Sequence, residues 1–191
     1  MLENDKQKHR KKIIYQIKEQ YGKVTYSYTC HLKEARIIRK KIDLFKGIQI
    51  FLSSVTTAGI FTDLLGKIFW ASVLSGGVSV ALLFINTYLK GIDFESMMNS
   101  HIQTSNDLWI VREKYISLLV DSDILSSENL ISRRDELTSI TAEIYSKELK
   151  TSKKAYEQTQ VALKNEEEQF FSLEELNSML PQILRERDDA S

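Results

Sequence analysis

The sequence predicts an all-α membrane protein: a two-span transmembrane helical hairpin with long cytoplasmic helices packed as a hairpin or a coiled coil. Glycine and proline together supply only 8 of the 191 residues. That is too few for the frequent turns of sandwiches and barrels, so helices are expected almost throughout. Residues 47–91 contain only three charged side chains, those of Asp63, Lys67 and Lys90. A long block with so few charges between highly charged segments is typical of membrane insertion.

The charges of the chain cancel in total but are separated along its length. Residues 1–46 hold 13 basic and 5 acidic residues, a net charge of +8, whereas residues 92–191 hold 11 basic and 20 acidic residues, a net charge of −9. The single cysteine, Cys30, cannot form an intrachain disulfide, and no Cys/His spacing typical of a zinc site occurs. A reducing compartment is therefore expected, with no metal and no cofactor.

Residues 1–46 are predicted to form a basic cytoplasmic N-terminal helix. Apolar residues recur every three or four positions from Ile13 to Ile42, as they do on a helix with one buried face. The opposite face is strongly basic, which suits solvent, anionic lipid or a phosphate-bearing signal. No RNA-binding signature accompanies it, so no DNA or RNA partner is expected. The candidate signal or lipid contacts on this face are Lys33, Arg36, Arg39 and Lys40.

Residues 47–90 are predicted to form the hairpin, with spans at about 47–65 and 68–89. At about 1.5 Å rise per residue the second span extends about 33 Å, enough for the roughly 30 Å hydrocarbon core, and the first extends about 28 Å. Gly66 and Lys67 supply a tight polar turn, so both chain ends share one side of the bilayer. Because basic residues precede the first span, both termini are expected in the cytoplasm.

Polar residues follow one face of each span. They occupy an arc of about 80° in the first span and about 60° in the second, at about 100° per residue. Such faces pack the spans together, or they line a path between several copies, because two spans alone cannot enclose a pore. An alternative places the whole hairpin in the core of a water-soluble bundle. The polar residues are Gln49, Ser53, Thr56 and Asp63 in the first span and Ser72, Ser75, Ser79 and Asn86 in the second.

Residues 91–170 are predicted to form a cytoplasmic helical hairpin. A helix from about Phe94 to Val120 is broken where Asp and Ser cluster at 121–127, and a long second helix is expected over 128–170. Apolar residues are spaced along both segments among charges. That pattern suits antiparallel packing of the second helix on the first.

Residues 171–191 are predicted to contain a short separate helix followed by a tail. Ser172 and Glu175 have the spacing of a capping box, which marks the start of a helix. Pro181 is expected to kink or end this helix, because proline has no backbone N–H to donate.

No residue pattern typical of an active site occurs in the sequence. Carboxylates such as Asp121 and the run 166–168 have no basic, nucleophilic or metal-ligating companion nearby in the sequence. His9, His31 and His101 are scattered singly, as ordinary surface or core histidines are. A glycine-rich phosphate loop is also missing. No catalytic residue is therefore assigned, and the protein is not expected to be an enzyme.

Short motifs accompany this order of features in the C-terminal half. They read R-x2-Y-x2-LL, D-E-L, I-Y and T-S-x2-A-Y. Together with the basic helix and the hairpin, they resemble the SLATT domain family over about residues 20–165. The proline that usually precedes the T-S pair is replaced by Lys150. The motif residues are Arg112, Tyr115, Leu118 and Leu119; Asp135, Glu136 and Leu137; Ile144 and Tyr145; and Thr151, Ser152, Ala155 and Tyr156.

The resemblance to SLATT implies a non-enzymatic effector of bacterial cyclic-oligonucleotide, anti-phage defence systems. Such an effector oligomerises in the inner membrane and, on an infection signal, permeabilises it as a pore or by disruption, which arrests or kills the host. The implied partners are further copies of the chain, the lipid bilayer and a nucleotide-signal synthase system or sensor protein. The implied ligand is a cyclic oligonucleotide, bound directly or through a partner. The alternative function is a membrane-anchored helical scaffold that recruits a cytoplasmic partner.

Overall fold

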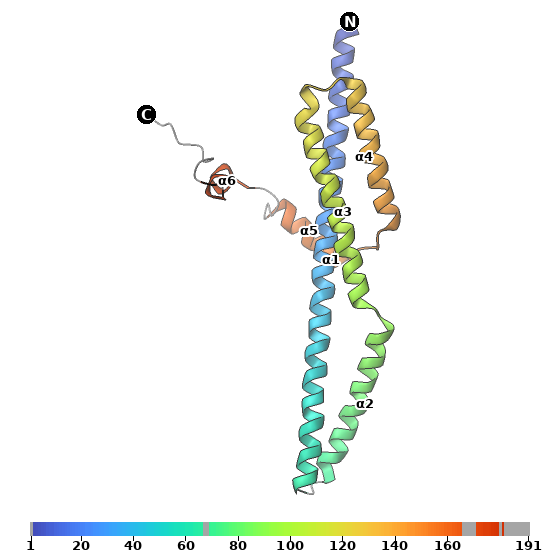
Figure 1. Ribbon diagram of the computed structural model, residues 1–191, viewed down its shortest axis with the longest axis vertical. Coiled ribbons are helices and arrows are strands. Elements are labelled where there is room, and N and C mark those ends of the chain that lie inside the picture. The colour runs from blue at the N-terminus through green and yellow to red at the C-terminus, as the bar shows by residue number, and fades with distance from the viewer. Residues whose placement is uncertain (1, 67–68, 166–170, 180, 182–191) are drawn as a thin grey trace, which may run out of the picture.

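One helix runs along the whole molecule. The structure is a computed structural model that describes residues 2–66, 69–165, 171–179 and 181, and these residues contain helices and no strand, which confirms the all-α fold class. Helix α1 (Leu2–Gly66) has 65 residues and spans roughly 98 Å (Figure 1). The predicted basic helix and first span are therefore one continuous element. Gly47 stands at their junction, and one interior glycine costs only about 1 kcal/mol of helix stability.

Helix α2 (Phe69–Gly91) lies beside the C-terminal half of α1 and completes the predicted hairpin (Figure 1). Helix α1 ends at Gly66, and residues 67 and 68 of the predicted turn and second span lie outside the described residues. Two residues then join α2 to helix α3 (Phe94–Val120). The Asp93 carboxylate starts α3, because its Oδ1 accepts a hydrogen bond from the Ser96 backbone N–H at 2.9 Å.

Helix α3, helix α4 (Ser127–Lys147) and the N-terminal half of α1 form a helical body. The sequence predicts that this body is cytoplasmic, and it is called the cytoplasmic body below. A 3-10 turn over Asp121–Asp123 separates α3 from α4, which confirms the predicted break and antiparallel hairpin as far as Lys147. Several residues of the SLATT-like motifs lie in the core, so these motifs specify packing. The buried core residues are Ile13, Ile17, Val24, Leu108, Val111, Tyr115, Leu118, Leu130 and Leu137.

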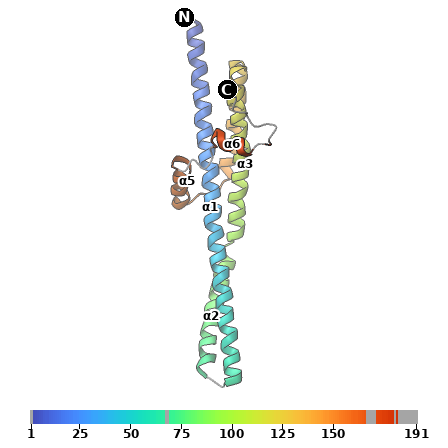
Figure 2. The same cartoon turned by 90° about the vertical axis from the view of Figure 1, so that its left-hand side faces the viewer.

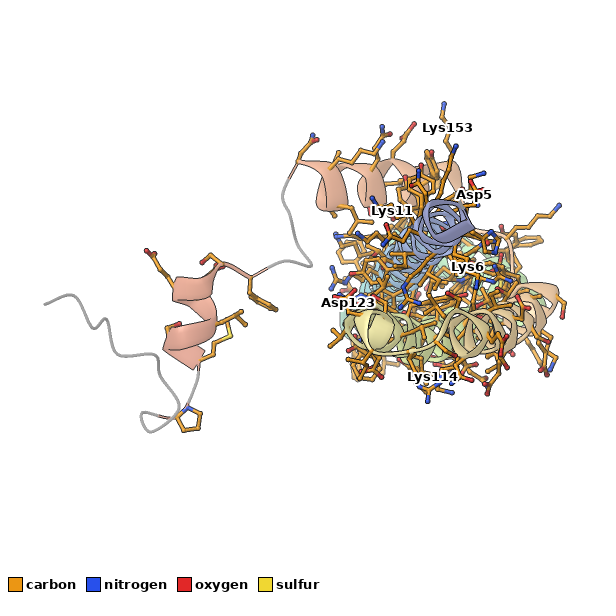
Figure 3. The ribbon with its side chains drawn as sticks, turned by 90° about the horizontal axis from the view of Figure 1, so that it is seen from above. Asp5, Lys6, Lys11, Lys114, Asp123 and Lys153 are labelled. Atoms are coloured by element: carbon orange, nitrogen blue, oxygen red, sulfur yellow. The ribbon has the colours of Figure 1, made fainter. Side chains whose placement is uncertain are left out.

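The prediction of one long helix over 128–170 is wrong. Helix α4 ends at Lys147, and helix α5 (Lys153–Lys164) packs on the side of α1 opposite to α3 and α4 (Figures 2 and 3). Viewed from above, Lys153 of α5 and Lys114 of α3 point away from α1 in opposite directions (Figure 3). Residues 166–170, the end of the predicted helix, lie outside the described residues.

Ser152 and Glu34 explain the break before α5. Ser152 caps α5, since its Oγ accepts from the Ala155 N–H at 3.2 Å. The buried Glu34 of α1 accepts from both the Ser152 backbone N–H, at 2.8 Å, and the Ser152 Oγ, at 2.5 Å. The fully buried side chains of Ala155 and Thr159 then fix α5 in its packed position. These contacts compete successfully with continuation of α4.

The short helix α6 (Leu173–Met179) begins at the predicted capping box. The Ser172 N–H donates to Glu175 Oε2 at 2.7 Å, and the Glu175 N–H donates to Ser172 Oγ at 3.2 Å. Pro181 lies beyond the last helical residue, whereas residues 180 and 182–191 lie outside the described residues. The predicted start of this helix is confirmed.

The hairpin exposes large apolar side chains. Both α1 and α2 contain a stretch long and apolar enough to cross a membrane, and almost none of either stretch is buried in the protein. A water-soluble bundle would cover these side chains, so their exposure contradicts that alternative. More than half of the surface is exposed for Ile50, Phe51, Trp70, Leu83 and Phe84.

Candidate functional site

The two spans approach closely at Gly59 and Ser75. A Cβ atom at residue 59 would lie 1.9 Å from Ser75 Oγ and 3.2 Å from the Ala71 carbonyl oxygen. Ser75 is buried, and its Oγ donates to the Ala71 carbonyl oxygen at 2.8 Å. Ser75 was predicted to line a pore or an interhelical face. It packs between the two spans of a single chain.

A hydrogen bond joins the spans near the ends that are remote from the predicted turn after Gly66. The Gln49 Nε2 donates to the Asn86 Oδ1 at 2.7 Å. Gln49 is half-buried and Asn86 is exposed. Interhelical hydrogen bonds of this kind contribute about 0.6 kcal/mol in a membrane. The two predicted polar faces therefore meet here.

The other predicted polar residues divide between the interface and the surface. Thr56 and Ser72 are half-buried, whereas Ser53 and Ser79 are exposed. The side chain of Asp63 lies outside the described residues. Each polar face is thus turned partly toward the other span and partly outward.

Hydroxyl groups in the spans fall into two classes. Most donate to the backbone carbonyl four residues earlier, as serine and threonine commonly do in helices. No partner is present for Ser53, Ser72 or Ser79 among the described residues. All three belong to the predicted polar faces, and their hydroxyls are available to another helix or to water. The hydroxyls bonded within their own helix are those of Ser54, Thr56, Thr57, Thr62, Ser75 and Thr87.

The predicted basic contact surface lies on the part of α1 that precedes the first span. Lys33 is half-buried, and Arg36, Arg39 and Lys40 are exposed. Lys33 and Arg36 each have an interaction partner. The Arg39 Nε lies 4.0 Å from Asp43 Oδ2, one helical turn away. These side chains form an accessible, partly neutralised cationic surface.

A buried histidine cluster joins three parts of the cytoplasmic body. The Nδ1 atoms of His31 and His101 are 2.9 Å apart, and His31 Nε2 lies 3.1 Å from Glu148 Oε2. Both histidines are almost fully buried, at 1% and 2% exposed. The sequence analysis missed this cluster, because its members are 70 and 117 residues apart. Each histidine does occupy a position on the apolar face of its helix, which was the available signal.

The Glu148 carboxylate favours one arrangement of the protons in this cluster. Because a carboxylate accepts, we assign the proton of the neutral His31 to Nε2, and His31 Nδ1 then accepts from His101 Nδ1–H. The opposite arrangement would place a lone pair of His31 against that carboxylate. One added proton on His101 Nε2 preserves both hydrogen bonds. A second added proton, on His31 Nδ1, would bring that N–H group against the His101 Nδ1–H group.

Burial governs the charge of this cluster. It lowers the pKa of His31, against the opposing charge of Glu34. Burial and the charge of His31 lower the pKa of His101, against Glu34 and Glu148. Burial also raises the pKa of Glu148, against the opposing charge of His101. Both imidazoles are therefore held in their neutral forms at neutral pH.

The contact between the two spans offers helix packing and hydrogen bonding, and the histidine cluster offers proton binding. In the part of the chain that the structure describes, no group of three or more His, Cys, Asp or Glu side chains is placed to hold a metal ion. The buried imidazoles face each other and a carboxylate, so they are not arranged around a substrate-sized space.

Comparison with known proteins identifies the family. The model of the SMODS and SLOG-associating 2TM effector domain family 4 matches residues 13–175, which include both spans, the buried core of the helical body and the histidine cluster. No curated protein and no solved structure matches the chain. The two exposed apolar helices fit the two transmembrane segments in the family's description. The chain belongs to this SLATT family of two-transmembrane effector domains.

Proposed function

We propose that the chain is a non-enzymatic bacterial defence effector that oligomerises in the inner membrane and permeabilises it on an infection signal. Membership of a two-transmembrane effector family supports the membrane role, and the association with SMODS and SLOG supports the defence role. The basic residues before the first span support cytoplasmic termini. A nucleotide-signal synthase system or sensor is the proposed upstream partner.

The dimensions of the hairpin support insertion across the bilayer. Trp70 and Tyr88 are exposed near opposite ends of α2. Their separation of 18 residues corresponds to about 27 Å along the helix, close to the thickness of the hydrocarbon core. Aromatic residues of this type favour the two membrane–water interfaces. The exposed apolar band between them would contact acyl chains.

The exposed, unbonded hydroxyls of Ser53 and Ser79 carry the oligomer proposal. They lie at membrane depth on a surface that is otherwise strongly apolar, where an unsatisfied polar group is costly. A neighbouring copy supplies a hydrogen-bonding partner, and several copies can surround a hydrated path. A single hairpin cannot, because two helices enclose no space.

Leakage of a fluorescent dye from liposomes tests this function. We expect Ser53→Ala with Ser79→Ala to weaken each contact between copies about eight-fold, since each lost hydrogen bond contributes about 0.6 kcal/mol. Leakage should fall accordingly. Ser54→Ala is the matched control, because the Ser54 hydroxyl already bonds to the Ile50 carbonyl oxygen within its helix. Equal leakage from the double variant and the control would contradict the proposed role of the hydroxyls, and insertion without any leakage would favour the scaffold alternative.

The cationic surface is the proposed contact for a cyclic oligonucleotide signal or for anionic lipid. Arg39 and Lys40 are exposed and carry the phosphate-binding chemistry of this surface. Arg39→Glu with Lys40→Glu should abolish signal-dependent leakage and leave membrane insertion unchanged. Retained response to the cyclic oligonucleotide would remove this surface from the proposal and leave a partner protein as the sensor.

A further inference from the structure

A pocket lies where the membrane hairpin joins the cytoplasmic body. It has a volume of about 420 Å³ and is formed between α1 and the break that separates α2 from α3. Its apolar part is lined by Ile42, Phe45, Leu89 and Ile92. The rings of Phe45 and Phe94 stack with their centroids 6.2 Å apart. This volume is in the range of about 300–1,000 Å³ that is typical of small-molecule sites.

The position of the pocket corresponds to the headgroup layer of a bilayer. Large apolar side chains are exposed from Ile50 on α1 and up to Tyr88 on α2. On the other side of the pocket the buried side chains begin with Ile42, as expected for a protein segment in water. The pocket therefore lies between the part of the chain that suits acyl chains and the part that suits water.

Charges of both signs surround the pocket. Lys46 Nζ lies 3.0 Å from Glu95 Oε1, and the Asp93 Oδ1 accepts the N–H that caps α3. Lys90 also lines the pocket, and no partner for its ammonium group is present among the described residues. The pocket thus combines one unpaired cation with two carboxylates that retain free acceptor positions.

We propose that this pocket binds the headgroup of an aminophospholipid, with the phosphate at Lys90 and the ammonium group at the carboxylates of Asp93 and Glu95. The inference rests on the proposed insertion of the hairpin in the bilayer. Lys46 already pairs with Glu95, so a purely anionic headgroup at Lys90 would bring no cation to the Asp93 carboxylate. A choline headgroup has no N–H to donate to them. An ethanolamine headgroup satisfies both signs of charge, and its acyl chains continue along the apolar band.

Such a lipid would act at the joint of the molecule. The pocket is lined by α1, by the end of α2 and by the start of α3. A bound headgroup therefore contacts both the membrane hairpin and the first turn of the cytoplasmic body. Its occupancy would stabilise the observed angle between α2 and α3, so the response of the effector would depend on the lipid composition.

Native mass spectrometry of the full chain tests the proposal. The protein is extracted from bilayers that contain equal amounts of phosphatidylethanolamine, phosphatidylcholine and phosphatidylglycerol. We expect retained phosphatidylethanolamine to exceed each of the others at least five-fold. Lys90→Gln and Asp93→Asn should each remove most of this enrichment. Asparagine caps helices as well as aspartate does, so the second variant retains the start of α3.

One control tests whether the loss of any exposed lysine reduces lipid retention, and another tests whether the ligand needs acyl chains. Lys154→Gln, at an exposed position of α5, should leave the enrichment unchanged. Soluble glycerophosphoethanolamine should not displace the bound lipid, because it has no acyl chains; displacement would overturn a lipid as the ligand. Equal retention of the three lipids, preference for phosphatidylglycerol, or unchanged enrichment in both pocket variants would also overturn the proposal. Lipid retention is measured without leakage, so its failure is distinct from failure of the proposed function.

Discussion

Gly59 sets the distance between the membrane helices. A methyl group there would contact Ser75 and the Ala71 carbonyl oxygen, both closer than ordinary packing allows. Gly59→Ala should therefore destabilise the hairpin by about 1–3 kcal/mol, the usual range for overpacking. Thermal unfolding in detergent measures this effect, with the loss of cross-linking between the two spans as the readout.

Gly77→Ala is the matched control for that substitution. No atom lies within 4 Å of a Cβ at Gly77, which is also in a membrane helix. An alanine there should be neutral or stabilising by about 0.5–1 kcal/mol, because alanine favours helix more than glycine does. Equal effects of the two substitutions would show that the spans do not cross as observed.

The histidine cluster predicts a pH dependence of the cytoplasmic body. Burial lowers the pKa of His31 and of His101 below the ordinary value of 6.5 in the folded chain. The unfolded chain therefore binds more protons as the pH falls below about 6.5, and stability decreases there. The raised pKa of Glu148 has the opposite effect on stability, because its folded form binds the proton more readily, and this effect occurs at pH values nearer its ordinary pKa of 4.5. The Tm should therefore decrease when the pH is lowered from about 7.5 to about 6.0.

Two variants test whether the cluster causes this dependence. His101→Gln should make the Tm less sensitive to pH over that interval, because one buried imidazole is gone. His9→Gln changes an exposed histidine of α1, the helix that also contains His31, and should leave the profile unaltered. A His101→Gln profile that matches the wild-type profile would show that other groups are responsible.

Helix α5 is held by a small number of polar contacts at its start. Ser152→Ala removes the cap of α5 and the hydroxyl that donates to the buried Glu34, while the backbone N–H of residue 152 can still donate to that carboxylate. The local cost should be about 1–2 kcal/mol, the typical range for a lost cap. Amide hydrogen exchange in Lys153–Lys164 should accelerate, while exchange in α3 remains slow.

Ser146→Ala provides the comparison for this prediction. Ser146 is an exposed serine near the end of α4, and its Oγ bonds to the Glu143 carbonyl oxygen of the same helix. Its replacement should leave exchange in α5 unaltered. Uniform acceleration over the cytoplasmic helices in the Ser152→Ala variant would contradict an independent attachment of α5.

The long, regular elements could be predicted from sequence because their signals are local. Residues 47–90 contain only three charged side chains over two membrane lengths, and Ser172 and Glu175 form a capping box within four residues. The break at 148–152 was missed, because no glycine or proline marks it and Lys150 replaces the expected proline. The break depends on Glu34, which lies 118 residues away from Ser152. The histidine cluster was missed for the same physical reason, since only tertiary packing brings its members together.

The whole molecule is organised around one helix that serves two environments. The N-terminal half of α1 packs in the buried core of α3 and α4, and its C-terminal half forms the first membrane span (Figure 1). No break in α1 separates these halves. We therefore expect a change in how α3 and α5 pack on α1 to affect the hairpin, through α1 and through the α2–α3 joint.

Deletion of the cytoplasmic helices is a poor test of this organisation. Removal of residues 92–191 would expose the core side chains of α1, including the fully buried Ile17 and Val24. A loss of function would then be a consequence of aggregation and would not identify the role of these helices. Single substitutions that retain the core are more informative.

The membrane topology of the hairpin tests the central claim most directly. Cys30 is first replaced by serine, and a single cysteine is introduced by Gly66→Cys at the end of α1 or by Lys154→Cys on α5. Cells whose outer membrane has been removed or permeabilised, and whose inner membrane is intact, are then treated with a membrane-impermeant maleimide. The account predicts labelling at residue 66 in intact cells and at residue 154 only after permeabilisation. Labelling of both positions from the same side, or recovery of the protein in the soluble fraction, would contradict it.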